Sequence, residues 1–197
     1  MTAGMVVTIA VEGITDAAVV RRILTDHRIV VAGEYGLRGK RHIDDKLRAF
    51  NAAAKYGNWL VVRDLDDDAQ CAADLVAALL PSPSARMRLR VAVRAIESWL
   101  LADAEGFSDY FSVAAHHVPE NPESLTNPKA ELVRVAQKSR SRALRSDILP
   151  SPGTTALVGP GYVARIIEYA ESTWSWSRAA RRSDSLRRCI RSVKAIK

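Results

Sequence analysis

Three acidic residues stand directly after two apolar segments, and they are the residues best placed to do chemistry. Glu12 follows the β-branched run 5–11, and Asp64 and Asp66 follow the apolar run 58–63. In an open parallel sheet, ligands bind beyond the carboxyl ends of the strands. If the two runs are neighbouring strands, their acids meet at one sheet edge.

Two further carboxylates extend this set. Asp16 lies one helical turn beyond Glu12, and Glu97 lies just past a fourth strand-like run. Converging carboxylates repel one another and raise each other's pKa unless a cation is present. Oxygen ligands suit Mg²⁺ or Mn²⁺, and the lack of a His/Cys cluster argues against zinc. We therefore expect a metal site of Glu12, Asp16, Asp64, Asp66 and Glu97.

Each acid also has a simpler interpretation. Residues 66–68 could cap the following helix, Asp16 could be a first-turn charge, and Glu97 could pair with a nearby arginine. Taken singly, these acids are weak signals. Their conjunction favours the metal site.

The elements that would position these acids alternate between strand and helix, which is typical of a parallel sheet covered by helices. We expect strands at 5–11, 28–32, 58–63 and 87–94, and helices from a Thr15 cap onward, at 43–56 and at 69–80. The fourth strand alternates apolar residues with arginines, as expected near an edge. Further helices are expected at 96–102, 106–111, 129–140, 162–173 and 185–195.

Charge divides the chain unevenly. Residues 1–103 hold 14 basic and 13 acidic residues of the 29 and 22 in the chain, which leaves 15 and 9 for residues 104–197. The net charge of +7 points to an anionic partner. We predict an α/β metal-binding domain at 1–103 and a basic helical extension at 104–197 packed on it.

Sequence motifs resemble those of a known fold. Val11-Glu12-Gly13-Ile14-Thr15-Asp16 and the run Val61 to Asp66 resemble the two Toprim signatures, and Asp16 resembles the second acid of the overcoming-lysogenization-defect (OLD) nucleases. Nearly the whole chain is similar to a prokaryotic Toprim-like family of unknown function. The further motifs that carry this likeness are Arg94 to Asp103, Pro128-Lys129, Gly159 to Tyr162 and Ser183 to Arg188.

The resemblance implies a mostly parallel four-stranded sheet flanked by helices, and Mg²⁺-dependent cleavage of phosphodiester bonds with Glu12, Asp64 and Asp66 as catalytic metal ligands. A partner ATPase in trans is also implied, because residues 33–41 lack the spacing and the Ser or Thr of a Walker A motif. Lys40 of this glycine-rich loop is a candidate to reach a phosphate, although a solvated basic loop is an equal alternative.

The basic tail offers a binding surface for nucleic acid. Arg187, Arg188, Arg191 and Lys194 would cover one face of the last helix while an apolar face packs, although such a face can simply aid solubility. Trp174 and Trp176 could stack on bases, whereas Trp59 and Trp99 fit core patterns.

Other features bound the location and the rival functions. We expect a cytoplasmic protein without a membrane span, with Cys71 and Cys189 as buried thiols. The first rival function is a non-catalytic accessory protein that binds a partner ATPase or nucleic acid. The second is a phosphate-transferring enzyme that acts on a small nucleotide, but the sequence has no nucleotide-binding glycine motif of proper spacing.

Overall fold

The computed structural model describes residues 5–196 and divides the chain into two compact units. The first comprises residues up to Val93 together with the segment from Ser185, and the second comprises Arg94–Asp184. This division differs from the expected boundary after Asp103, because the last helix belongs with the sheet and the 96–102 helix belongs with the helical unit.

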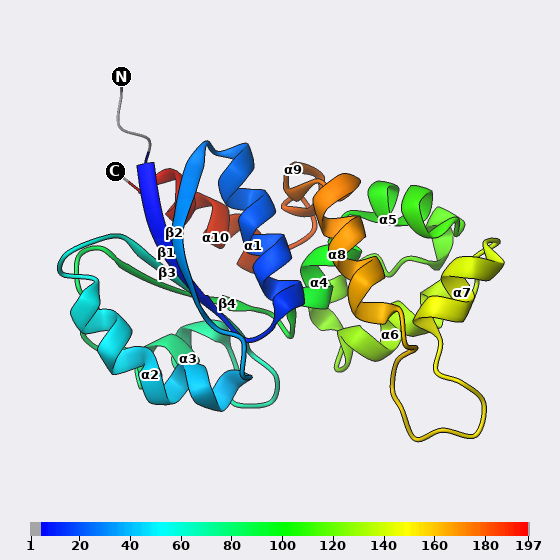
Figure 1. Ribbon diagram of the computed structural model, residues 1–197, viewed down its shortest axis with the longest axis horizontal. Helices are drawn as coiled ribbons and strands as arrows, with labels where there is room; N and C mark the ends of the chain where they lie inside the picture. Colours follow the sequence, from blue (N-terminus) through cyan, green and yellow to red (C-terminus); the bar gives the residue numbers. More distant parts are fainter. Residues whose placement is uncertain (1–4, 197) are drawn as a thin grey trace. The chain divides into compact units, whose positions relative to one another are not determined.

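The first unit is an α/β fold with a four-stranded, all-parallel sheet in the order β2-β1-β3-β4. Helices α1 and α10 lie on one face of this sheet, and α2 and α3 lie on the other (Figure 1). The architecture is consistent with the expected Toprim-like fold. Its elements are β1 (Met5–Val11), α1 (Ile14–Asp26), β2 (Ile29–Gly36), α2 (Lys40–Ala53), β3 (Trp59–Asp64), α3 (Ala72–Leu79), β4 (Met87–Ala92) and α10 (Asp184–Lys194).

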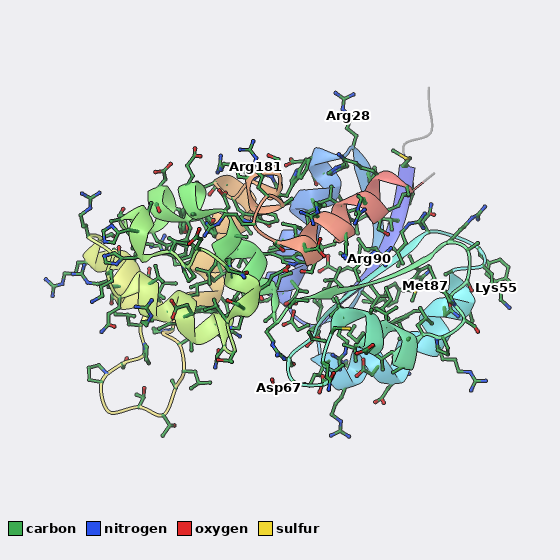
Figure 2. All side chains as sticks on the ribbon, turned by 180° about the vertical axis from the view of Figure 1, so that it is seen from behind. Arg28, Lys55, Asp67, Met87, Arg90 and Arg181 are labelled. Carbon is green, nitrogen blue, oxygen red and sulfur yellow. The ribbon has the colours of Figure 1, made fainter. Side chains whose placement is uncertain are left out.

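Alternation along β4 sets the two faces of the sheet at its edge. Met87 and Leu89 are buried against α2 residues such as Leu47, whereas Arg88 and Arg90 point to the face that α10 covers. Strand β4 pairs only with β3 in the described sheet, so the expectation of an edge position is confirmed. Figure 2 shows Arg90 beside α10 and Met87 nearer α2 and α3.

Two local expectations in this unit were wrong. Helix α1 has Gly13 at its N-cap without a side-chain cap, and Thr15 lies inside the helix. Strand β2 continues through Gly33 to Gly36, whereas the sequence pattern predicted a loop from Gly33 onward. Gly36 has a φ of +92°, and a Cβ there would lie 2.2 Å from the carbonyl oxygen of Val11. The glycine thus permits close pairing of β1 and β2 up to the last residue of β2.

The second unit contains only helices and loops in its described residues. Its core is aromatic: Trp99, Phe107, Phe111, Tyr169 and Trp174 are fully buried. The helices are α4 (Ile96–Ala102), α5 (Ala104–Phe111), the 3-10 turns η1 (Ala115–His117) and η2 (Pro122–Ser124), α6 (Pro128–Ala136), α7 (Arg142–Ile148), α8 (Tyr162–Ser172) and α9 (Trp176–Ala179).

Several side-chain placements in the structure correct the sequence interpretation. Trp174 is buried and its indole Nε1 donates a hydrogen bond to the carbonyl oxygen of Trp99, 3.0 Å away, so it is not placed to stack on bases. Trp176 is half-buried. Cys71 is exposed, whereas Cys189 is buried as expected. Among residues 5–196, no helix has the length and apolar character needed to cross a membrane.

Candidate functional site

The carboxyl ends of β1 and β3 bring the first two candidate residues together. These strands are neighbours in the sheet, with Ala10 paired to Val61. The backbone N–H of Asp64 donates a hydrogen bond to Oε1 of Glu12 over 2.9 Å. Parallel pairing therefore places the residue that follows β1 beside the last residue of β3, as the strand-end argument requires.

Glu12 lies in an environment that disfavours its negative charge. Burial raises its pKa to about 7, and the charges of Asp16 and Asp66 contribute in the same direction. The Asp64 N–H and the charge of Arg63 oppose this rise but do not cancel it. Three carboxylates thus interact at this edge, and a cation placed among them would be stabilised.

Asp16 is held at the start of α1, where it is 5% exposed. The hydroxyl of Thr15 donates to Asp16 Oδ2 over 3.2 Å. A Cβ at Gly13 would lie 3.2 Å from the same oxygen, so the glycine turn leaves room for the carboxylate to approach the backbone.

Lys40 is placed beside the acids by the loop that precedes α2. The backbone N–H of Gly39 donates to the carbonyl oxygen of Glu12 over 2.9 Å, which fixes the start of α2 next to the end of β1. Lys40 Nζ lies 2.9 Å from Asp66 Oδ2 and 3.0 Å from Asp68 Oδ2. Hydrogen bonds to these two carboxylates raise the pKa of Lys40. The candidate phosphate-binding lysine thus serves here as a counter-charge.

Arg63 forms a second internal ion pair that sequence reasoning did not assign. Its side chain is 4% exposed and contacts Asp44 and Asp68, with N–O distances of 2.8 Å and 2.7 Å. Burial lowers the pKa of Arg63, but the hydrogen bonds to both acids outweigh this and raise it overall. The available signal was an arginine at the end of an apolar strand, because a buried guanidinium group needs carboxylate partners.

The residue types at this edge suit a divalent metal ion, but their side-chain positions do not form a set of ligands. Carboxylate oxygens suit Mg²⁺ or Mn²⁺. Yet among residues 5–196 no three Asp, Glu, His or Cys side chains converge closely enough to hold a metal ion, and Asp66 is engaged with Lys40. Sharing of one cation by Glu12, Asp64 and Asp66 therefore stays a prediction, and it requires Lys40 to withdraw.

Glu97 lies in the second unit, within an arrangement of its own. It is 4% exposed and accepts a hydrogen bond from the hydroxyl of Tyr162 over 3.0 Å. Lys129 Nζ lies 3.4 Å from Glu97 Oε1 and 5.6 Å from the centre of the Tyr162 ring. Residues from three separate motifs thus meet around one buried carboxylate. Participation of Glu97 in the Glu12 site stays a prediction.

The candidate nucleic-acid helix, α10, has the burial pattern that its sequence predicts. Leu186, Ile190 and Val193 are buried. The helix runs antiparallel to β4, because Ser185 Oγ accepts from the N–H of Val93 and Arg88 donates to the carbonyl oxygens of Ser192 and Ala195. The candidate contacts are all exposed: Arg187, Arg188, Arg191 and Lys194.

Comparison with known proteins identifies no relative of this chain. No family model matches the chain, and no curated protein or solved structure matches it. The class defined by the fold and the strand-end acids is thus an α/β protein with an acidic sheet edge. The Toprim-like family remains a resemblance of motifs.

Proposed function

We propose that this chain is a Mg²⁺- or Mn²⁺-dependent nuclease of the Toprim type. The single observation that carries the proposal is the meeting of Glu12 with Asp64 at the carboxyl edge of a parallel sheet, where Asp16 and Asp66 add to the negative charge. The basic face of α10 supports a polyanionic substrate.

Different residues at this edge would have different roles in the reaction. Glu12, Asp64 and Asp66 would hold the cation, and Asp16 would orient water from the first turn of α1. A bound divalent cation supplies charge neutralisation at the phosphate and a lower pKa for bound water. Once Lys40 leaves Asp66 and Asp68, its ammonium group is available to a phosphate oxygen.

A second candidate is a non-catalytic accessory protein that binds a partner ATPase or nucleic acid. The observation that favours it is the pairing of Asp66 and Asp68 with Lys40, and of Asp68 with Arg63. Acids that are neutralised by basic residues of the same chain do not need an external cation for stability.

Calorimetric titration with Mn²⁺, followed by incubation with single- and double-stranded DNA and RNA, separates the two candidates. The nuclease proposal expects Mn²⁺ binding and cleavage in the intact protein, both lost in Glu12→Gln and in Asp64→Asn. The matched control is Asp45→Asn, since Asp45 is an exposed acid on α2. Cleavage that survives in both site variants, or that persists in EDTA, contradicts the proposal. Mn²⁺ binding without cleavage of any substrate favours the accessory protein.

A further inference from the structure

Edge strand β4 carries two arginines on the face that α10 covers, and the proposed active site uses neither of them. Arg88 and Arg90 alternate with the buried Met87, Leu89 and Val91, so both guanidinium groups lie on the face that α10 covers. Arginines on an apolar strand are unusual, because burying a charge is unfavourable unless it is paired.

A shallow pocket opens between this strand and α10. It is lined by arginines from both elements, and among residues 5–196 no acidic side chain lines it. The lining residues are Ala85, Arg88, Arg90, Arg188, Arg191, Ser192 and Ala195.

The two strand arginines hydrogen-bond to backbone carbonyl groups. Arg88 Nε donates to Ser192 O over 3.1 Å and its Nη2 to Ala195 O over 2.9 Å, which fixes the end of α10. Arg90 Nη1 donates to Leu89 O over 2.8 Å. Within residues 5–196, neither arginine has a carboxylate partner, and the buried Arg90 Nε has no hydrogen-bond partner.

In the described part of the chain, no carboxylate offsets the positive charge of Arg88 or of Arg90. Burial lowers the pKa of Arg88 and of Arg90, and for Arg88 the charge of Arg90 acts in the same direction. An anion in the pocket would relieve this repulsion. Guanidinium groups present a planar fork of donors that matches the oxygens of a phosphate group.

We propose that the pocket between β4 and α10 binds a phosphate group, with Arg90 at its base and Arg188 and Arg191 at its rim. The phosphate source that we favour is the backbone of a nucleic acid, and this part of the inference rests on the proposed function. Phosphate binding itself needs no metal and no cleavage, so it can be measured separately.

The position of the pocket relates it to the acidic edge. Arg90, at the base of the pocket, lies two residues before Ala92, which pairs with Asp64 at the end of β3. At about 3.3 Å per residue, this separation along β4 is roughly 7 Å. A duplex strand carries one phosphate per about 3.4 Å, so roughly two phosphates span this distance.

Charge reversal on α10 tests the pocket with a matched control. Arg188→Glu with Arg191→Glu changes two lining residues, whereas Arg187→Glu with Lys194→Glu changes two exposed residues of the same helix that do not line it. Both pairs change the net charge equally. Binding of fluorescein-labelled single-stranded and duplex 12-mers is measured by anisotropy in EDTA, between 50 and 200 mM salt.

The proposal expects at least a tenfold loss of oligonucleotide affinity in the lining pair and a clearly smaller loss in the control pair. The slope of log affinity against log salt should fall by about two in the lining pair for duplex DNA. Equal losses of affinity in both pairs would mean that the effect depends only on net charge, and would overturn the proposal. Unchanged binding in the lining pair would also overturn it. Loss of binding with retained cleavage of long substrates would separate the pocket from the nuclease proposal.

Competition identifies the source of the phosphate group. If inorganic phosphate displaces the 12-mer only at far higher concentration, the backbone is the ligand. If inorganic phosphate binds saturably and the 12-mer does not bind, the ligand is a small phosphate. A poly-glutamate peptide that binds as tightly as the 12-mer, and is lost in the same lining pair, would overturn the assignment to phosphate.

A third variant guards against a merely structural role. Arg90→Met keeps an unbranched apolar side chain similar to the aliphatic part of arginine and removes the charge. The expected result is an unchanged or higher melting temperature in chloride buffer and a smaller rise on adding phosphate, because a ligand that binds the native state stabilises it. A lower melting temperature with an undiminished phosphate response would make Arg90 structural and overturn the proposal.

Discussion

Two arginines on neighbouring strands, the buried Arg63 and the half-buried Arg90, differ in how their charge is balanced. Arg63 ends its apolar run on β3 and contacts the carboxylates of Asp44 and Asp68. Arg90 lies on β4, paired in register with Val62, and its hydrogen bond goes to a backbone carbonyl group. The same residue type in adjacent strands is thus internally neutralised in one case and available to an external anion in the other.

The comparison extends to the regions around these arginines. At the carboxyl edge of the sheet, Lys40 and Arg63 neutralise the acids that follow β3. In the pocket beside α10, several guanidinium groups lie together, and no acidic side chain of the described residues 5–196 lines the pocket. Breaking a buried charge pair leaves a charge without its partner and is strongly destabilising, whereas removing a half-buried charge that has no carboxylate partner is not expected to be. Stability measurements should therefore distinguish the two regions.

The largest effect is expected for Arg63→Met. Loss of this guanidinium leaves Asp44 and Asp68 without their buried partner, and breaking such a pair costs about 3 kcal/mol of unfolding free energy. Urea denaturation of this variant beside Arg90→Met gives the direct comparison, with Arg48→Met of the exposed face of α2 as the control, expected within about 0.5 kcal/mol of the parent protein. Equal destabilisation by Arg63→Met and Arg90→Met would remove the distinction between the two arginines.

A smaller effect is expected from Glu12, whose negative charge is disfavoured by burial and by the neighbouring Asp16 and Asp66. Its pKa of about 7 lies above the ordinary value of 4.5, so between these values the folded protein binds more protons than the unfolded chain. Stability should therefore fall as pH rises through this window, by about 2 kcal/mol, and Glu12→Gln should escape the fall because glutamine does not ionise.

Denaturation of both proteins at pH 4.5 and pH 8 measures this difference. The gap between Glu12→Gln and the parent protein should be near zero at the lower pH and should favour the variant at the higher pH. Mn²⁺ should close the gap at pH 8, because it stabilises the ionised carboxylate of the parent protein alone. A variant that is less stable at both pH values would show that Glu12 is held for structure.

The sequence predicted the strands well because their apolar runs are long and are separated from one another by turn residues. It also predicted that the residues following β1 and β3 lie at one edge, since parallel neighbours impose this. It failed where tertiary contacts decide. Strand β2 extends as far as Gly36 because this glycine pairs with Val11. Helix α7 has only Ile148 buried, which leaves no helical periodicity to detect.

The pairing of charges was harder to predict than their positions. Asp66 and Lys40 are 26 residues apart, and only the packing of the Gly39 loop against Glu12 brings them into contact. The arginines of β4 were recognised as the mark of an edge strand. Their common pocket with Arg188 and Arg191 could not be foreseen, because it depends on the last helix returning to the first unit.

The smallest predicted effect concerns Lys40, which connects the compensated edge to the proposed chemistry. Its ammonium group contacts Asp66 and Asp68, and both ion pairs are partly exposed. Such pairs contribute about 1 kcal/mol or less to stability, so Lys40→Met should hardly alter the melting temperature. The same pairs compete with a divalent cation for Asp66, and their removal should raise Mn²⁺ affinity by up to about tenfold.

Calorimetric titration of Lys40→Met beside Lys46→Met, an exposed lysine on the same helix, separates this competition from a change in net charge. If Lys40 also moves to the phosphate during cleavage, the variant should bind Mn²⁺ more tightly and yet cleave more slowly. A gain in affinity with unchanged cleavage would limit Lys40 to the role of counter-charge. Equal Mn²⁺ affinity in the two lysine variants would mean that the cation does not bind where Lys40 now lies, and the proposed metal ligands would have to be sought away from Asp66.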